Sequence, residues 1–155
     1  MSVPRAILGF VADEDGDWVA LLDCGHRRHV RHRPPLSSYA WVLDPAGREA
    51  HLGQAIECDR CRQRTWPEGL VHHRDTSWFD ADTIPAGLRA DHRVKTGTWG
   101  RLEVSEGALI LRFAGPLGAK VRVEAGETAA IPPALSHRVE VEGPVRFRVQ
   151  FWRVP

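Results

Sequence analysis

Residues 145–151 read VRFRVQF, the clearest secondary-structure signal in the chain. Large apolar side chains alternate with Arg146, Arg148 and Gln150, so one face of an extended segment is apolar and the other is polar. We therefore predict a half-buried β-strand here. Shorter apolar runs precede it, separated by glycine and proline turns, at residues 102–104, 108–113, 121–123 and 129–131. Many short strands at even spacing predict a β-sandwich or β-barrel for this half of the chain.

A second stretch narrows the choice to one kind of barrel. Residues 126–137, GETAAIPPALSH, resemble the second motif of the cupin family, Gly-x5-Pro-x-Gly-x2-His. Gly126, Pro132 and His137 match this motif, and Ala134 stands where it has glycine. The resemblance implies a strand, a proline turn and a return strand that directs His137 into the barrel.

The first cupin motif, His-x-His-x3-4-Glu-x6-Gly, fits poorly. Gly107 supplies its last glycine, but the glutamate position falls on Gly100 and His92 is one residue out of register. Glu103 and Glu106 are nearby and also out of register. The resemblance therefore implies the barrel without its usual set of metal ligands.

Candidate ligand-binding residues follow from these two motifs. We expect His92 and His137 to face the interior of the barrel, with Lys95 or Trp99 close by. Together with Arg93, they would offer cationic and hydrogen-bonding groups to a small molecule or an anion. Two imidazoles without a carboxylate make an incomplete metal site, so the sequence favours a bound ligand over a second metal in the barrel.

Residues 75–155 as a whole resemble the small cupin domain of the tellurite-resistance protein family. The distinctive stretch is His92-x2-Lys95-x-Gly97-x-Trp99-Gly100. In that family the domain occurs alone or ahead of a methyltransferase domain, and none follows here because the chain stops at Pro155. The resemblance implies a context of tellurite-type stress, and we expect no methylation of tellurite.

The three cysteines of the chain all lie in metal-binding motifs. Cys24 and His26 form a Cys-x-His pair, and Cys58 and Cys61 form a Cys-x-x-Cys pair. Thiolate and imidazole ligands delivered by two tight turns are typical of structural zinc. The spacing therefore predicts a zinc ion held by Cys24, His26, Cys58 and Cys61; a reduced Cys-x-x-Cys or a redox pair is the alternative.

The basic run at residues 26–33, HRRHVRHR, leaves the histidine ligand open. His29 is the alternative to His26, and His32 also competes; we favour His26 because residues at i and i+2 project to the same side of an extended segment. The run has four arginines, which would attract phosphate. Acidic residues lie just upstream, and residues 1–66 hold nine basic and nine acidic residues. We therefore expect a locally paired loop and no nucleic-acid partner.

The modules divide at about residue 66. We expect a zinc-containing domain over residues 1–66, a polar linker over 67–80, PEGLVHHRDTSWFD, and the cupin-like barrel over 81–155. In the first domain we predict strands at 6–11, 18–22 and 39–43, turns at 13–17 and 44–47, and a short helix at 48–56. Residues 5–62 resemble a small bacterial domain of unknown function, which implies no activity. So small a domain buries little core, and a metal would stabilise it.

Overall composition gives few further constraints. The chain has 155 residues and a formal net charge of +1, so it exerts no general attraction on nucleic acid or acidic membranes. The apolar patch at the amino terminus is too short for a signal peptide, and no apolar run reaches the length of a membrane span. Reduced cysteines in metal motifs fit a reducing compartment, so we expect a cytoplasmic protein.

Three hypotheses of function remain open. The first is a zinc-stabilised cupin protein that binds a small molecule or anion. The second is a metal-dependent cupin enzyme of the dioxygenase or isomerase type, which would need three or four inward ligands. The third is a protein–protein adaptor whose barrel is a packed core. A homodimer is a reasonable arrangement for a cupin barrel, although the sequence defines no interface.

Overall fold

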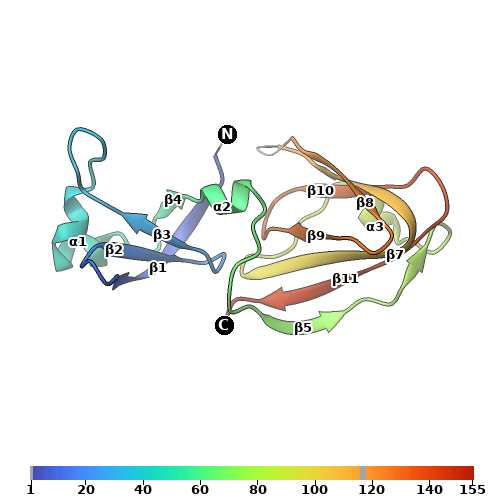
Figure 1. Ribbon diagram of the computed structural model, residues 1–155, viewed down its shortest axis with the longest axis horizontal. Coiled ribbons are helices and arrows are strands. Elements are labelled where there is room, and N and C mark those ends of the chain that lie inside the picture. The colour runs from blue at the N-terminus through green and yellow to red at the C-terminus, as the bar shows by residue number, and fades with distance from the viewer. Residues whose placement is uncertain (1, 116–117) are drawn as a thin grey trace.

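The computed structural model describes residues 2–115 and 118–155 and contains two β-modules, one at each end of the molecule (Figure 1). The first module is a four-stranded antiparallel sheet in the order β3-β2-β1-β4. Its strands are β1 (Pro4–Ala12), β2 (Trp18–Leu22), β3 (Arg27–Val30) and β4 (Ala55–Glu57). The predicted strands at 6–11 and 18–22 are confirmed. The basic run is not wholly a loop, since its first half forms edge strand β3.

Short helical segments complete this module: η1 (Ala40–Leu43), α1 (Pro45–Ala50) and α2 (Asp59–Arg62). The strand predicted at 39–43 is wrong, because these residues form a single 3-10 turn. Gly47 closes the chain onto this turn so tightly that a Cβ would collide with the Trp41 carbonyl. The helix predicted at 48–56 is also wrong in extent: α1 starts at Pro45, and residues 55–57 pair with β1.

The second module is a β-barrel built around the long strand β7 (Thr98–Phe113). The first half of β7 lies between β9 (Thr128–Ile131) and β11 (Val145–Arg153). Its second half lies between β8 (Lys120–Glu124) and β10 (His137–Glu140). The strands predicted at 102–104 and 108–113 are therefore one strand. It turns at Gly107, whose φ of 73° and close approach to the Pro144 carbonyl exclude a side chain.

The stretch predicted as a linker contributes to the barrel. β5 (Val71–Asp75) and β6 (Phe79–Asp80) both pair with β11, followed by the single turn of α3 (Ala86–Arg89). Every residue of β5 is exposed. The polar composition that suggested a linker thus reflects an edge strand with solvent on its side chains, and only about residues 63–70 connect the modules.

Alternation in β11 agrees with the prediction from its sequence. Val145, Phe147 and Val149 are buried, and the side chains between them are half-buried. The buried apolar residues of both modules form one continuous cluster. That cluster runs through the three cysteines and Trp99, so the seam between the modules is itself part of the core. Within the described residues, no helix has the length and apolar character needed to cross a membrane.

Candidate metal centre and barrel cavity

The four predicted metal ligands converge in the seam between the modules. Cys24 and His26 lie in the turn between β2 and β3, Cys58 lies just before α2, and Cys61 lies within it. All four side chains are buried, and their ligand atoms lie within 4.8 Å of one another. Gly25, which lies between Cys24 and His26, has a φ of 90°, and its lack of a side chain leaves room for Val154 and Pro67. The local turn chemistry therefore brings together the residues that the spacing predicted.

Distances among the ligand atoms fit one tetrahedral ion. His26 Nδ1 lies 3.5 Å from Cys24 Sγ, 3.4 Å from Cys58 Sγ and 3.5 Å from Cys61 Sγ. The Cys24 and Cys58 sulfurs are 3.9 Å apart. With bonds of about 2.3 Å to sulfur and about 2.0 Å to nitrogen, a tetrahedral zinc would hold such atoms roughly 3.5–3.8 Å apart. The other two sulfur–sulfur pairs lie within 4.8 Å, so the cluster could hold a metal ion after at most a small inward movement of Cys61.

The ring of His26 is oriented for ligation. Its Nε2 lies 2.7 Å from the Thr65 carbonyl oxygen, and an Nε2–H that donates there leaves the Nδ1 lone pair directed at the sulfurs. A ligating histidine usually donates its other ring N–H to such an acceptor. The two competing histidines point elsewhere: His29 Nε2 lies 2.9 Å from Asp13, and His32 Nδ1 accepts a hydrogen bond from the Tyr39 N–H. This geometry favours His26 over both.

The pKa values of the three thiols show that they could all be deprotonated only with a cation among them. The Cys58 thiolate accepts hydrogen bonds from the other two thiols, which lowers the pKa of Cys58 and raises that of Cys24 to about 11. Hydrogen bonds with Cys24 and with Cys58, together with burial, raise the pKa of Cys61. Three thiolates at this separation repel one another in a buried site, so full deprotonation requires a positive ion among them.

Two side chains connect the metal centre to the barrel. Buried Arg5 donates from Nε to Cys61 Sγ at 3.3 Å and from Nη2 to the Pro133 carbonyl at 2.7 Å. Trp99 Nε1 donates to the Cys24 carbonyl at 2.7 Å, and its ring meets that of His26 edge to face. Trp99 was predicted in the barrel cavity; instead it is fully buried in the seam, because its indole N–H finds its acceptor there.

The remaining predicted ligand-binding residues meet at a cavity of about 250 Å³ within the barrel. His92, Lys95 and His137 line it, with Arg93 also present as expected. Sequence reasoning missed Arg74, because it lies in the stretch taken for a linker. Apolar side chains complete the lining: Leu88, Val94, Leu102, Ile131, Val139, Val149 and Phe151. None of the described residues that line it is acidic.

The two cavity histidines are held alike. The backbones of His92 and His137 form a reciprocal pair of hydrogen bonds, and their ring centroids lie 4.2 Å apart. His137 Nδ1 lies 2.9 Å from the Leu135 carbonyl, and His92 Nδ1 lies 3.0 Å from the Ala90 carbonyl. Each ring can thus donate Nδ1–H to the backbone and keep Nε2 as an acceptor. Burial lowers the pKa of His137 to about 4, so this ring is neutral at physiological pH.

Carboxylates near the first cupin motif are engaged outside the cavity. Glu103 forms an ion pair with Arg148 at 2.9 Å, and Glu106 is exposed opposite Arg146 in the neighbouring strand. Ala134, which replaces the glycine of the second motif, has a φ of 59°. The turn thus keeps the backbone that glycine would adopt, and His137 keeps its inward direction.

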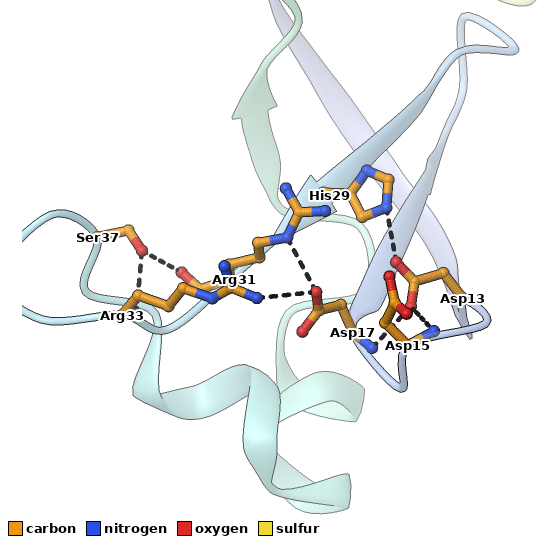
Figure 2. Close-up of polar contacts among 7 residues, drawn as sticks. All are labelled: Asp13, Asp15, Asp17, His29, Arg31, Arg33 and Ser37. Carbon is orange, nitrogen blue, oxygen red and sulfur yellow. Dashed lines mark hydrogen bonds and ion pairs between the residues drawn. The ribbon is translucent and has the colours of Figure 1, made fainter.

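Part of the basic run is paired with carboxylates of its own module. Figure 2 shows the Arg31 and Arg33 side chains meeting the carboxylate of Asp17, each at 3.1 Å. In the same view His29 points at Asp13, whose carboxylate also caps the N–H groups of the turn. The predicted local pairing is confirmed for these three side chains, while Arg28 instead donates to the Glu57 carbonyl and to the Tyr39 hydroxyl.

Comparison with known proteins agrees with this two-module organisation. Residues 8–65 match the family described as "Protein of unknown function (DUF3565)", and residues 74–149 match the "TehB-like domain". The uncharacterized protein YeaR of Escherichia coli is 30% identical over 98 residues, which cover 57% of this chain and 82% of YeaR. The chain belongs to the YeaR family. Both resemblances drawn from the sequence are thereby confirmed.

Solved structures of other proteins share the fold of the barrel module. A crystal structure of an E. coli K12 protein is 27% identical with a TM-score of 0.54, covering 59% of this chain and 97% of that one. TehB from Haemophilus influenzae is 23% identical with a TM-score of 0.51, covering 56% of this chain and 32% of TehB. The likeness to TehB concerns the fold alone. The YeaR relationship and the TehB likeness each span little more than half of this chain.

Proposed function

We propose that this protein is a zinc-stabilised barrel protein that binds a small anion or polar molecule in its barrel cavity. Zinc is the metal proposed for the cluster because three thiolates and one imidazole form a closed, four-ligand set without an open position. Such a site supplies folding energy rather than catalysis. Three reduced thiols also support a reducing, cytoplasmic location. On this view residues 1–66 are the zinc module, and the barrel begins at β5.

One observation carries the binding function. Arg74, Arg93 and Lys95 line the cavity, and none of its described lining residues is acidic. Three like charges around a partly apolar hollow attract an anion and repel one another without it. The TehB-like match supports tellurite-type stress as the biological context, and it makes oxyanions suitable probes.

The test is titration of the protein with small anions, monitored by the imidazole NMR signals of His92 and His137. Phosphate, tellurite and acetate serve as probes. We expect saturable shifts that weaken as salt is added, and a several-fold weaker affinity in Lys95→Met. Arg122→Met removes one positive charge from an exposed residue of strand β8, outside this cavity, and serves as the matched control. Equal losses in both variants, or no saturable shift, would reject anion binding in the cavity.

A metal-dependent enzyme remains the second candidate because of the two histidines. Rings that donate Nδ1–H to carbonyls and keep Nε2 for the cavity are oriented as metal ligands often are. An enzyme of this type would need a third protein or substrate ligand. Retention of a second metal by purified protein, lost in His137→Gln, would favour this candidate over simple anion binding.

A further inference from the structure

The lining of the barrel cavity separates into an apolar interior and a cationic rim. Leu102, Ile131, Val139 and Val149 are at most 6% exposed, so they form the inner walls. The cationic side chains of Arg74, Arg93 and Lys95 belong to exposed residues and lie at the opening. The cavity is therefore amphiphilic, with charge at one end only.

Apolar surface continues beyond the cavity. A neighbouring hollow of about 360 Å³ shares Arg74, Leu88, His92, Val149 and Phe151 with it. Phe79 and Pro85 add further apolar surface there. The guanidinium of Arg74 lies over the Phe151 ring, 4.5 Å from its centroid, so one cation stands directly against this apolar wall.

An inorganic oxyanion can bind weakly at the cationic rim, but it fits the apolar inner walls poorly. It is hydrated on every side, so entry would remove its water without giving it polar partners along the inner walls. A molecule with an apolar body and one anionic group fits both parts, because the body covers the walls while the charge stays at the rim. Each buried methylene group would strengthen binding about fourfold.

His137 adds a requirement at the inner end. Its residue is 1% exposed, its Nδ1 lies 2.9 Å from the Leu135 carbonyl, and Nε2 forms no hydrogen bond with another described residue. A neutral imidazole in this tautomer offers a lone pair at Nε2. A hydroxyl or N–H of the occupant would satisfy that acceptor, whereas a second anionic group would be repelled by it.

We propose that the natural occupant is a small organic acid, with a carboxylate at the Arg74–Arg93–Lys95 rim, an apolar body on the inner walls and a hydroxyl directed at His137. This rests on the proposed function, because it names the ligand class of the same cavity. A volume of about 250 Å³ equals that of about eight waters at roughly 30 Å³ each, so an acid of about eight to ten non-hydrogen atoms is expected.

Calorimetric titration of the whole, metal-loaded chain tests this with a ligand series. Acetate, butanoate, hexanoate, benzoate and 4-hydroxybenzoate are compared with phosphate and with neutral benzyl alcohol. We expect affinity to rise by about fourfold per methylene along the aliphatic acids until the cavity is full. 4-Hydroxybenzoate should bind several-fold more tightly than benzoate, and benzyl alcohol should bind weakly.

Two variants separate the parts of the cavity. Val149→Thr changes an inner wall at nearly constant volume and should weaken hexanoate several-fold while leaving acetate unchanged. His137→Leu removes the acceptor and should abolish the advantage of 4-hydroxybenzoate over benzoate. If Val149→Thr fails to fold, the slope of the aliphatic series in the unaltered protein still decides the question.

The outcomes distinguish this inference from the proposed function. Phosphate or acetate bound as tightly as hexanoate and benzoate would overturn the organic-acid inference and leave anion binding intact. Absence of binding by every anion in the series would overturn both. Benzyl alcohol bound as tightly as benzoate would overturn the role of the cationic rim.

Discussion

Three of the four strands of the first module are short and its core is thin, whereas the barrel is organised by one long strand. β7 spans 16 residues, but β2, β3 and β4 span five, four and three. Small domains bury too little surface to be stable on apolar burial alone. The cluster of Cys24, His26, Cys58 and Cys61 lies where the thin core meets the barrel. If the proposed zinc is bound, it would supply to the first module the stability that packing supplies to the second.

The largest effect expected from this contrast is the loss of the metal. Chelation, or His26→Ala, should unfold the first module and leave the barrel folded, since structural zinc contributes on the order of 10 kcal/mol in small peptides. Trp99 would become exposed to solvent and would lose its hydrogen bond to the Cys24 carbonyl. The tryptophan fluorescence of the chain should therefore shift to longer wavelength. Circular dichroism and tryptophan fluorescence check both parts.

His29→Ala is the matched control for the metal centre, because His29 is the nearest competing ligand in the sequence and pairs with Asp13 instead. It should retain the metal and the fold. Loss of the first module in both variants, or in neither, would contradict the assignment of His26.

The folding stability of the barrel should depend on pH because of buried His137. Burial lowers the pKa of His137 to about 4 from its ordinary value of 6.5, and nearby His92 adds to this against the opposing Leu135 hydrogen bond. The unfolded chain therefore binds a proton that the folded chain does not between these two values. Stability is full above pH 6.5 and falls as pH drops toward 4, by about 3 kcal/mol at most.

Urea unfolding of the wild type and His137→Gln at several pH values checks this. The acid sensitivity of the metal centre is common to both proteins and cancels in the difference between them. The difference in unfolding free energy should shift against the wild type as pH falls below 6.5. A difference that stays constant down to pH 4.5 would show that His137 is not buried in its neutral form.

A smaller effect is expected at the connection between the modules. Arg5→Met keeps the apolar stem but removes the donors to Cys61 and to the Pro133 carbonyl. Leaving a buried carbonyl unpaired costs about 1–3 kcal/mol, so the unfolding free energy should fall by about 2 kcal/mol. Arg28→Met, which removes a partly buried donor to Glu57 within the first module, is the control. Loosening of the seam, seen by NMR as faster hydrogen exchange of the Trp99 indole N–H, should follow Arg5→Met alone.

The smallest effect expected is a stabilisation. Ala134 adopts a φ of 59°, which is strained for a residue with a Cβ. Ala134→Gly should raise the unfolding free energy by up to about 1 kcal/mol, measured by urea unfolding. Ala129→Gly, in strand β9, should lower it by a similar amount, since glycine weakens a strand. Destabilisation by both substitutions would show that the turn at Ala134 is not strained.

Local signals in the sequence predicted the parts that depend on local chemistry. The alternation of residues 145–151 predicted β11, and the cysteine spacing predicted the four side chains that converge. The strand predicted at residues 39–43 is wrong because an apolar run of this length is compatible with either a strand or a helical turn. The close contact with Gly47 favours the turn, and the sequence does not reveal that contact. Strand β5 was mistaken for a linker because it is polar throughout. The side chains of an edge strand need not alternate between apolar and polar.

Contacts between the modules left no sequence signal. Arg5 lies among apolar residues of β1 and gives no sign that it reaches both Cys61 and Pro133. Trp99 matches a family motif beside His92, which suggested the cavity, but it sits on the other side of the strand among the metal ligands. Long-range contacts of this kind depend on how the two modules dock, and local patterns in one sequence do not predict that arrangement.

Native mass spectrometry of the purified chain tests the central claim most directly, because it counts the metal ions bound to one folded molecule. We expect one zinc per chain in the wild type and in His29→Ala, and none in His26→Ala. A folded wild-type chain without metal would contradict the zinc-stabilised module. Two metals per chain, with the second lost in His137→Gln, would instead make the barrel a metal site and favour the enzyme.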